Sequence, residues 1–183
     1  MITTEQHERL TALRRDLHAH PEVSLNEKWT AKRIAEFLQQ LKPDELLTEV
    51  GVHGVMALFD SGKPGPVRLF RCELDALPIT EVNTFAYKST VEGVSHKCGH
   101  DGHMAILCGL AEQLAKERPL TGKSWLLFQP AEENGEGAKA MLADPRMRAT
   151  KPERAYALHN LPGVEAGAVL LREGSFNASV NSI

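Results

Sequence analysis

The 183 residues are enough for about one ordinary domain, because domains usually contain roughly 100–200 residues. Hydrophobic residues make up 42% and charged residues 25%, and 21 basic against 24 acidic side chains leave a formal charge of −3 at pH 7. This balance excludes collagen-like, disordered and membrane-spanning chains. Because the chain has no basic run and only 5% aromatic residues, nucleic acid is not an expected partner.

The first residues are polar, and no apolar stretch approaches the ~18 residues of a membrane-spanning helix. These features favour a cytoplasmic location without a membrane partner. The cysteines are Cys72, Cys98 and Cys108. Their odd number, in a sequence without a secretory signal, favours free thiols or metal ligands over disulfides.

The first part of the chain predicts two amphipathic helices followed by three strands. Apolar residues at helical spacing predict a helix over residues 4–18 and a second over residues 26–41, capped by Asn26. Short apolar runs predict strands at 45–50, 54–59 and 67–72. The turn-forming residues 61–66 predict that the last two of these strands form a hairpin.

The second part continues the alternation of helices and strands. Residues 80–96 show no sustained period and predict an irregular functional loop. Helical spacing returns over residues 101–118, with Glu112 on the predicted solvent face. The remaining pattern predicts a strand buried on both faces at 124–128, a short helix at 137–142, and strands at 155–159 and 168–171. The alternation predicts an α/β layered domain.

Residues 96–103 read His-Lys-Cys-Gly-His-Asp-Gly-His, between the irregular loop and the predicted helix. Thiolate, imidazole and carboxylate groups close together, with glycines that let the backbone turn tightly, are typical of a transition-metal site. Cys98 and His100 are the candidate ligands, with Asp101 as a supporting carboxylate or further ligand. The alternative is a polar helix start beside a buried cysteine.

Glu132 and Glu133 follow the predicted strand 124–128, and open α/β sheets bind ligands beyond the carboxyl ends of their strands. One carboxylate can bind a cation while the other accepts a proton from water, although an isolated pair is more often a solvated turn. Asp75 and His159 also follow predicted strands. We therefore expect one sheet edge to gather Asp75, Cys98, His100, Glu132, Glu133 and His159.

Five motifs occur in a characteristic order: LHAHPE at 17–22, LDALPI at 74–79, HKCGHDGH at 96–103, QPAEE at 129–133 and LHN at 158–160. Together they resemble metal-dependent amidohydrolases of the aminoacylase and hippurate hydrolase type. That group also includes auxin-conjugate hydrolases and N-acetyl-diaminopimelate deacetylases, and it is more distantly similar to zinc carboxypeptidases. The similarity extends over nearly the whole chain.

The resemblance implies a three-layer, zinc-peptidase-like catalytic domain with a central mixed sheet and flanking helices. It implies a binuclear centre of two divalent metal ions, Zn or Mn with Co or Ni as further candidates, bound by Cys98, His100, Glu133 and His159. Glu132 would be the general base and acid for a metal-activated water, and Asp75 would orient a ligand. The implied reaction is hydrolysis of the amide bond of N-acyl amino acids, such as hippurate-like or N-acetyl substrates.

Members of this group are longer, because a lid or dimerisation domain interrupts the catalytic domain. The resemblance therefore implies that residues 1–174 are the N-terminal part of the catalytic domain and that residues 175–183 begin the connection to an absent lid. A further histidine ligand would be absent too, and exposed strand edges would favour a homo-oligomer or a complementing C-terminal chain.

Two alternatives to an active amidohydrolase remain. The first is a catalytically silent metal-binding fragment without the lid. The second, a cysteine hydrolase that uses Cys98 with a histidine base, explains less because Glu132, Glu133 and His159 would have no role.

Overall fold

The computed structural model describes residues 2–175, which form helices and a single five-stranded sheet. The predicted connecting segment at 175–183 lies, apart from Ser175, outside the described residues. The elements follow in the order α1 (Thr4–Ala19), α2 (Lys28–Gln40), β1 (Glu45–Val50), β2 (Gly54–Asp60), β3 (Val67–Glu73), α3 (His100–Lys116), β4 (Lys123–Gln129), α4 (Glu136–Ala143), α5 (Pro145–Thr150) and β5 (Arg154–Ala157).

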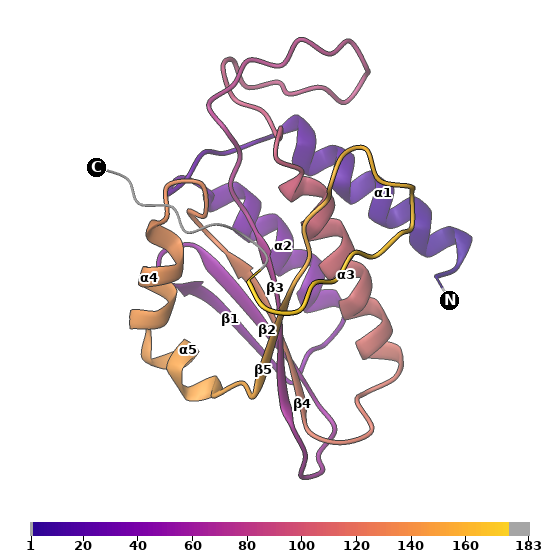
Figure 1. Ribbon diagram of the computed structural model, residues 1–183, viewed down its shortest axis with the longest axis vertical. Helices are drawn as coiled ribbons and strands as arrows, with labels where there is room; N and C mark the ends of the chain where they lie inside the picture. Colours follow the sequence, from indigo (N-terminus) through magenta and orange to yellow (C-terminus); the bar gives the residue numbers. More distant parts are fainter. Residues whose placement is uncertain (1, 176–183) are drawn as a thin grey trace.

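The strands lie in the order β1-β2-β4-β3-β5, and the sheet is mixed (Figure 1). β2 pairs antiparallel with β1 and β4, whereas β3 pairs parallel with β4 and β5. The predicted hairpin of β2 and β3 is therefore wrong, because β4 lies between them. The reason is burial: six of the seven residues of β4 are buried, so this strand is stable only in the middle of the sheet.

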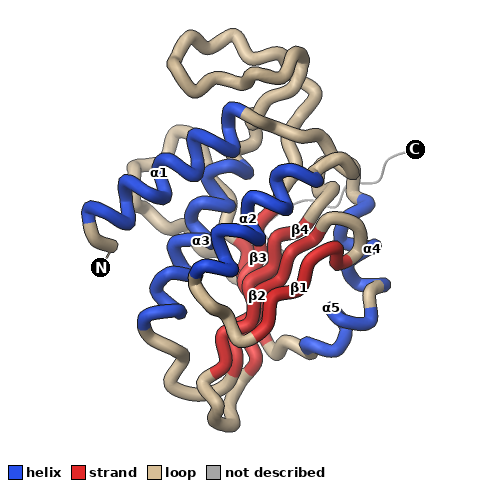
Figure 2. The backbone as a smooth tube through the Cα atoms, turned by 180° about the vertical axis from the view of Figure 1, so that it is seen from behind, coloured by secondary structure: helices blue, strands red, loops and turns tan. Residues whose placement is uncertain are grey.

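Helices cover both faces of the sheet, as Figures 1 and 2 show. On one face, α1, α2 and α3 pack against the strands in one hydrophobic core. The helices contribute Leu17, Ile34 and Met104 to it, and the strands contribute Phe59 and Phe128. On the other face, Met141 of α4 and Met147 of α5 pack against a second set of strand residues that includes Met56 and Leu127. The predicted three-layer α/β architecture is confirmed.

The start of α2 differs from the prediction. Asn26 does not cap the helix, since Glu27 occupies the N-cap position without a side-chain cap. The backbone N–H groups of Trp29 and Thr30 instead donate to the carboxylate of Glu22, at 3.2 and 2.8 Å. The carboxylate of Glu22 thus accepts the hydrogen bonds of the free backbone N–H groups at the start of α2. Local sequence patterns do not reveal this contact.

Glu112 was expected to face solvent, but its side chain is only 2% exposed. It accepts hydrogen bonds from Gln6 Nε2 at 2.7 Å and Arg9 Nε at 2.8 Å, which join α3 to α1. The prediction is wrong because α1 packs against the side of α3 that carries Glu112. A buried carboxylate that keeps such partners is stabilised.

The end of the described chain also differs from the prediction. β5 ends at Ala157, so His159 lies in the following loop, and the short helix α5 was not predicted. Residues 168–171 do not form the expected strand. Val169 is 73% and Leu171 90% exposed, so within the described residues this apolar run has no neighbouring strand with which to pair.

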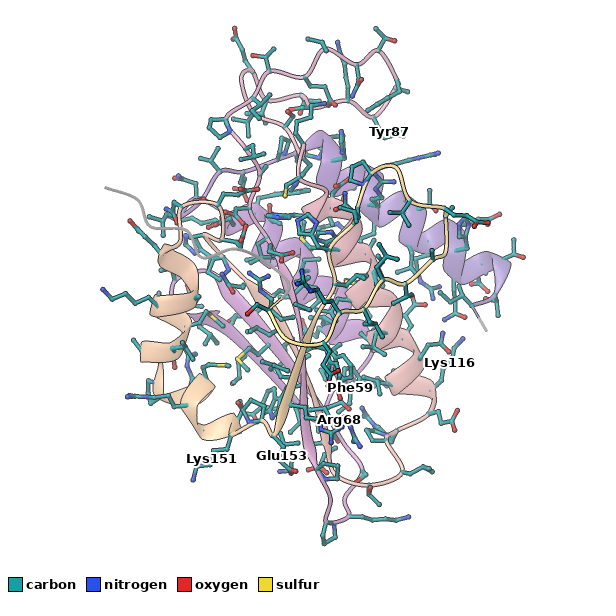
Figure 3. All side chains as sticks on the ribbon, viewed as in Figure 1. Phe59, Arg68, Tyr87, Lys116, Lys151 and Glu153 are labelled. Carbon is teal, nitrogen blue, oxygen red and sulfur yellow. The ribbon has the colours of Figure 1, made fainter. Side chains whose placement is uncertain are left out.

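The predicted irregular loop at 80–96 is confirmed and projects beyond the sheet edge at which α3 begins (Figure 1). Tyr87 of this loop lies against α1, with its ring centroid 4.9 Å from the guanidinium carbon of Arg15 (Figure 3). Glu81 accepts a hydrogen bond from the Ser89 backbone at 2.7 Å and anchors the loop. None of the helices formed by residues 2–175 combines the length and apolar character that crossing a bilayer requires.

Candidate metal centre

Three segments that are distant in the sequence meet at one edge of the sheet. β3 and β4 are parallel, so the residues that follow them, Asp75 and the Glu132-Glu133 pair, lie at the same edge. α3 begins there with His100, preceded by Gly99 in the left-handed conformation, φ 102°. Because glycine adopts this conformation without a Cβ penalty, the chain can turn sharply between Cys98 and the helix.

The imidazole of His100 is the central group of the site, and it is 1% exposed. Its Nδ1–H donates to the backbone carbonyl of Asp75 at 2.7 Å, which leaves Nε2 as the free nitrogen. This Nε2 is buried without a hydrogen-bond partner and lies 3.8 Å from Glu132 Oε2 and 3.7 Å from Glu133 Oε1. A buried nitrogen lone pair beside two carboxylates matches the donor set of a divalent cation.

Asp75 lies behind these groups and is fully buried. Its Oδ2 accepts hydrogen bonds from Ser24 Oγ at 2.7 Å and from the backbone N–H of Glu133 at 2.9 Å. Burial alone would raise the pKa of Asp75, but the adjacent imidazole of His100 and the hydrogen bonds from Glu133 and Ser24 outweigh it and lower this pKa to about 2. An ionised Asp75 therefore fixes the backbone that carries Glu133.

Asp75→Asn is expected to destabilise the metal-free chain in a pH-dependent way. The native pKa of about 2 lies below the ordinary value of 3.8, so the stabilisation is present above pH 4 and is lost as the pH falls towards 2. The difference in unfolding free energy between wild type and variant should shrink from about 2 kcal/mol at pH 5 to about 1 kcal/mol at pH 3. Urea unfolding followed by circular dichroism measures it.

The exposed Glu8→Gln variant is the matched control for this measurement, because it also replaces a carboxylate by an amide. It should leave the unfolding free energy close to that of wild type at each pH. A penalty for Asp75→Asn that stays constant between pH 5 and pH 3 would contradict an ionised, hydrogen-bonded Asp75.

Cys98 and His159 form a second pair of candidate ligands next to His100. Cys98 Sγ is 3.3 Å from His159 Nε2, and donor atoms of Cys98, His100 and His159 all lie within 4.8 Å of one another. Burial, together with the negative charges of Glu133 and Glu132, raises the pKa of the Cys98 thiol to about 12. A bound cation would compensate these charges and allow the thiolate to form.

The side chain of Glu132 is partly exposed, and its pKa is raised. Its side chain is 38% exposed, and burial together with the neighbouring charge of Glu133 raises its pKa. His100, Glu132 and Glu133 form a second group whose donor atoms lie within 4.8 Å of one another. A carboxylate with a raised pKa at the open side of such a group is suited to accept and return a proton.

The structure brings together the residues that the sequence singled out, with Asp75 behind the others, while their roles stay predictions. Asp101 points away from this group: its Oδ2 lies 2.9 Å from His18 Nδ1 and 3.1 Å from Arg14 Nε, both on α1. The suggestion that Asp101 is a further ligand is therefore wrong. The carboxylate instead attaches the start of α3 to α1.

Sequence reasoning missed two buried residues beside the site, Glu73 and His103. His103 Nδ1 donates to Glu73 Oε2 at 2.9 Å, and both residues form a third group of possible ligands with His100. The spacing of His100 and His103, three residues apart on a helix, was a signal that they share one face. Nothing in the sequence indicated Glu73.

Comparison with known proteins agrees with the motif pattern. Residues 69–180 match the family model described as peptidase family M20/M25/M40. The chain belongs to this family. The resemblance drawn from the five motifs is thereby confirmed at the level of the family.

Curated relatives of this M20 chain include N-acetylcysteine deacetylase of Bacillus subtilis, 37% identical over 176 residues that cover 96% of this chain and 46% of the relative. Hippurate hydrolase of Campylobacter jejuni is 35% identical over 170 residues, covering 93% of this chain and 44% of the relative. A crystal structure of a dinuclear metal binding M20 peptidase from Bacillus subtilis matches with a TM-score of 0.80 at 36% identity, covering 87% of this chain and 44% of that one. The M20 chain described here thus spans less than half the length of these relatives.

Proposed function

We propose that this chain carries the metal-binding and proton-transfer residues of an amidohydrolase that cleaves the amide bond of N-acyl amino acids. The observation that carries the proposal is His100 Nε2, which is buried without a partner between the two glutamates and the Cys98–His159 pair. The names of the relatives, a deacetylase of N-acetylcysteine and a hydrolase of hippurate, support the substrate class.

Two divalent cations would be held by Cys98, His100, Glu133 and His159. A thiolate with imidazoles suits Zn²⁺, whereas the added carboxylates also suit Mn²⁺, and Co²⁺ or Ni²⁺ are further candidates. When bound, such cations polarise an amide carbonyl and lower the pKa of a coordinated water. The relative described as a dinuclear metal binding peptidase supports a count of two.

Glu132 is the proposed general base and acid. Its raised pKa matches a carboxylate that takes a proton from the attacking water and then delivers it to the nitrogen of the leaving amine. Asp75 contributes indirectly, since it holds the backbone of Glu133 and faces the ring of His100, with its Oδ1 3.5 Å from Nδ1. Glu132, which follows β4, would thus transfer the proton, and Asp75, which follows β3, would position the ligands.

The proposal is tested on the purified 183-residue chain, first stripped with a chelator and then loaded with Zn²⁺ or Mn²⁺. We expect bound metal and metal-dependent release of free amino acid from N-acetyl and N-benzoyl amino acids. Metal binding without turnover would favour the silent fragment, and turnover that survives chelation would favour the cysteine hydrolase. Turnover that appears only after a C-terminal part of a relative is added would identify a complementing chain as the partner.

A further inference from the structure

We infer that His103 is a positioning residue, which holds the loop that carries His159 so that this imidazole meets Cys98. The inference deepens the proposed function and rests on it, because it concerns how one proposed ligand is placed. His103 itself is not assigned to a metal. Its contribution is the attachment of a weakly held segment to the rigid start of α3.

The segment that carries His159 has few other attachments. β5 lies at one edge of the sheet, all four of its residues are exposed, and His159 itself is exposed. Within the described residues, the hydrogen bonds that join residues 158–163 to other segments come from Cys98 and His103. Because Cys98 is itself a proposed ligand, His103 is the protein group left to fix this loop before a cation binds.

The contacts of His103 suit this task. Its ring is 3% exposed and lies on the first turn of α3. Nε2 lies 2.7 Å from the side-chain oxygen Oδ1 of Asn160 and 3.1 Å from the backbone nitrogen of the same residue. With a proton, Nε2 donates to Oδ1, and without one it accepts from the backbone N–H, so either form of the ring holds Asn160. The ring of His103 also packs edge-on against the ring of His159, with 4.8 Å between centroids. The loop is thus held at the residue next to the proposed ligand.

Glu73 fixes the ring of His103 from its other nitrogen. Its carboxylate accepts the Nδ1–H of His103 at 2.9 Å, which fixes the orientation of the ring and leaves Nε2 directed at Asn160. Burial would raise the pKa of Glu73, but the hydrogen bond from His103 and the charge of Arg71 outweigh it and lower this pKa. The chain of contacts from Arg71 through Glu73 and His103 to Asn160 therefore joins β3, α3 and the loop after β5.

Gly99 provides independent support for the position of Asn160. A Cβ atom at residue 99 would overlap the side-chain amide of Asn160, so the absence of a side chain there creates the space that the amide fills. Gly99 separates the proposed ligands Cys98 and His100. Asn160 is consequently packed against the ligand-bearing turn on one side and hydrogen-bonded to His103 on the other.

The test is a Co²⁺ titration of the full 183-residue chain, read from the thiolate-to-metal charge-transfer band that reports coordination by Cys98. The Co²⁺ affinity from this titration depends on whether His159 is in place as a further ligand. His103→Phe keeps a ring of similar volume but removes both hydrogen bonds. We expect it to weaken Co²⁺ binding by about 10- to 100-fold, the usual effect of losing a group that orients a ligand. His103→Gln can donate to Glu73 and accept from Asn160, so it should restore much of the affinity.

His18→Gln is the matched control, because His18 is also a buried histidine paired with a carboxylate, Asp101, and has no contact with the loop of His159. It should lower thermal stability without changing the Co²⁺ affinity. If the His103→Phe variant bound Co²⁺ as tightly as the wild type does, the inference would be overturned. Absence of the band in wild type would instead contradict the proposed metal site.

A second measurement does not depend on how well the variants fold. In the unsubstituted metal-free chain, ¹⁵N NMR of the imidazoles should show His103 with its proton on Nδ1, because Glu73 accepts there. An Nδ1 without a proton would exclude the hydrogen bond to Glu73 that fixes the ring and would overturn the inference as well.

Discussion

Glu132→Gln is expected to lower the rate of metal-dependent amide hydrolysis by about 10²- to 10⁴-fold, the usual contribution of a positioned general base. The amide has the shape of the carboxylate but cannot take a proton from water. The raised pKa of Glu132, caused by burial and by the charge of Glu133, is the property that the substitution removes. Measuring kcat together with metal content per chain separates a lost proton acceptor from a lost ligand.

Glu133→Gln is the matched comparison, because it makes the same chemical change one residue away. Glu133 is a proposed ligand whose Oε1 lies 3.7 Å from His100 Nε2, so this variant should lose bound metal together with activity. If Glu132→Gln lost metal as readily as Glu133→Gln did, Glu132 would be a ligand and the assignment of the base would be wrong. Full activity of Glu132→Gln would exclude it as the base.

Loading with Zn²⁺ or Mn²⁺ is expected to raise the melting temperature by about 8–16 °C. A cation at 1,000 times its Kd stabilises the folded state by about 4 kcal/mol, and each kcal/mol is worth about 2–4 °C for a chain of this size. The gain arises because a cation pairs the buried His100 Nε2 and neutralises the adjacent carboxylates of Glu132 and Glu133. Calorimetry with metal and with chelator measures the shift.

The control for this measurement is His100→Ala, which removes the imidazole that belongs to all three groups of possible ligands. Its melting temperature should be nearly the same with metal and with chelator. An equal shift in wild type and His100→Ala would show that the cation binds elsewhere on the chain. No shift in wild type would contradict the metal site.

Much of the fold could be predicted because the spacing of apolar residues along the chain distinguishes a helix from a strand. The predicted strands at 45–50, 54–59 and 67–72 agree with β1, β2 and β3 to within one residue, and the helix at 101–118 is close to α3. Strand pairing was predicted wrongly, since the turn at 61–66 leads into a strand that pairs with β4 instead. Pairing depends on which strand must be buried on both faces, and a local turn pattern does not carry that information.

The part of the candidate site that could be predicted consists of residues at the ends of strands. Asp75, Glu132 and Glu133 each follow a strand whose carboxyl end reaches the same edge, so their proximity follows from the topology. Glu73 and His103 were missed because their role depends on contacts between distant segments. Glu73 contacts His103, 30 residues further along, and His103 contacts Asn160, a further 57 residues along. Such contacts become visible only in three dimensions.

The separation of Cys98 and His159 along the chain, 61 residues, has a consequence for the folding pathway. β3, β4 and β5 must all be docked before the thiol and the imidazole come together, because these strands lie between or beside the two residues. Closing such long loops is slow, and a nascent or collapsed chain offers a cation only isolated donors. Tight coordination of the proposed cations would thus be a late step, and their binding would stabilise the completed tertiary structure and no earlier intermediate.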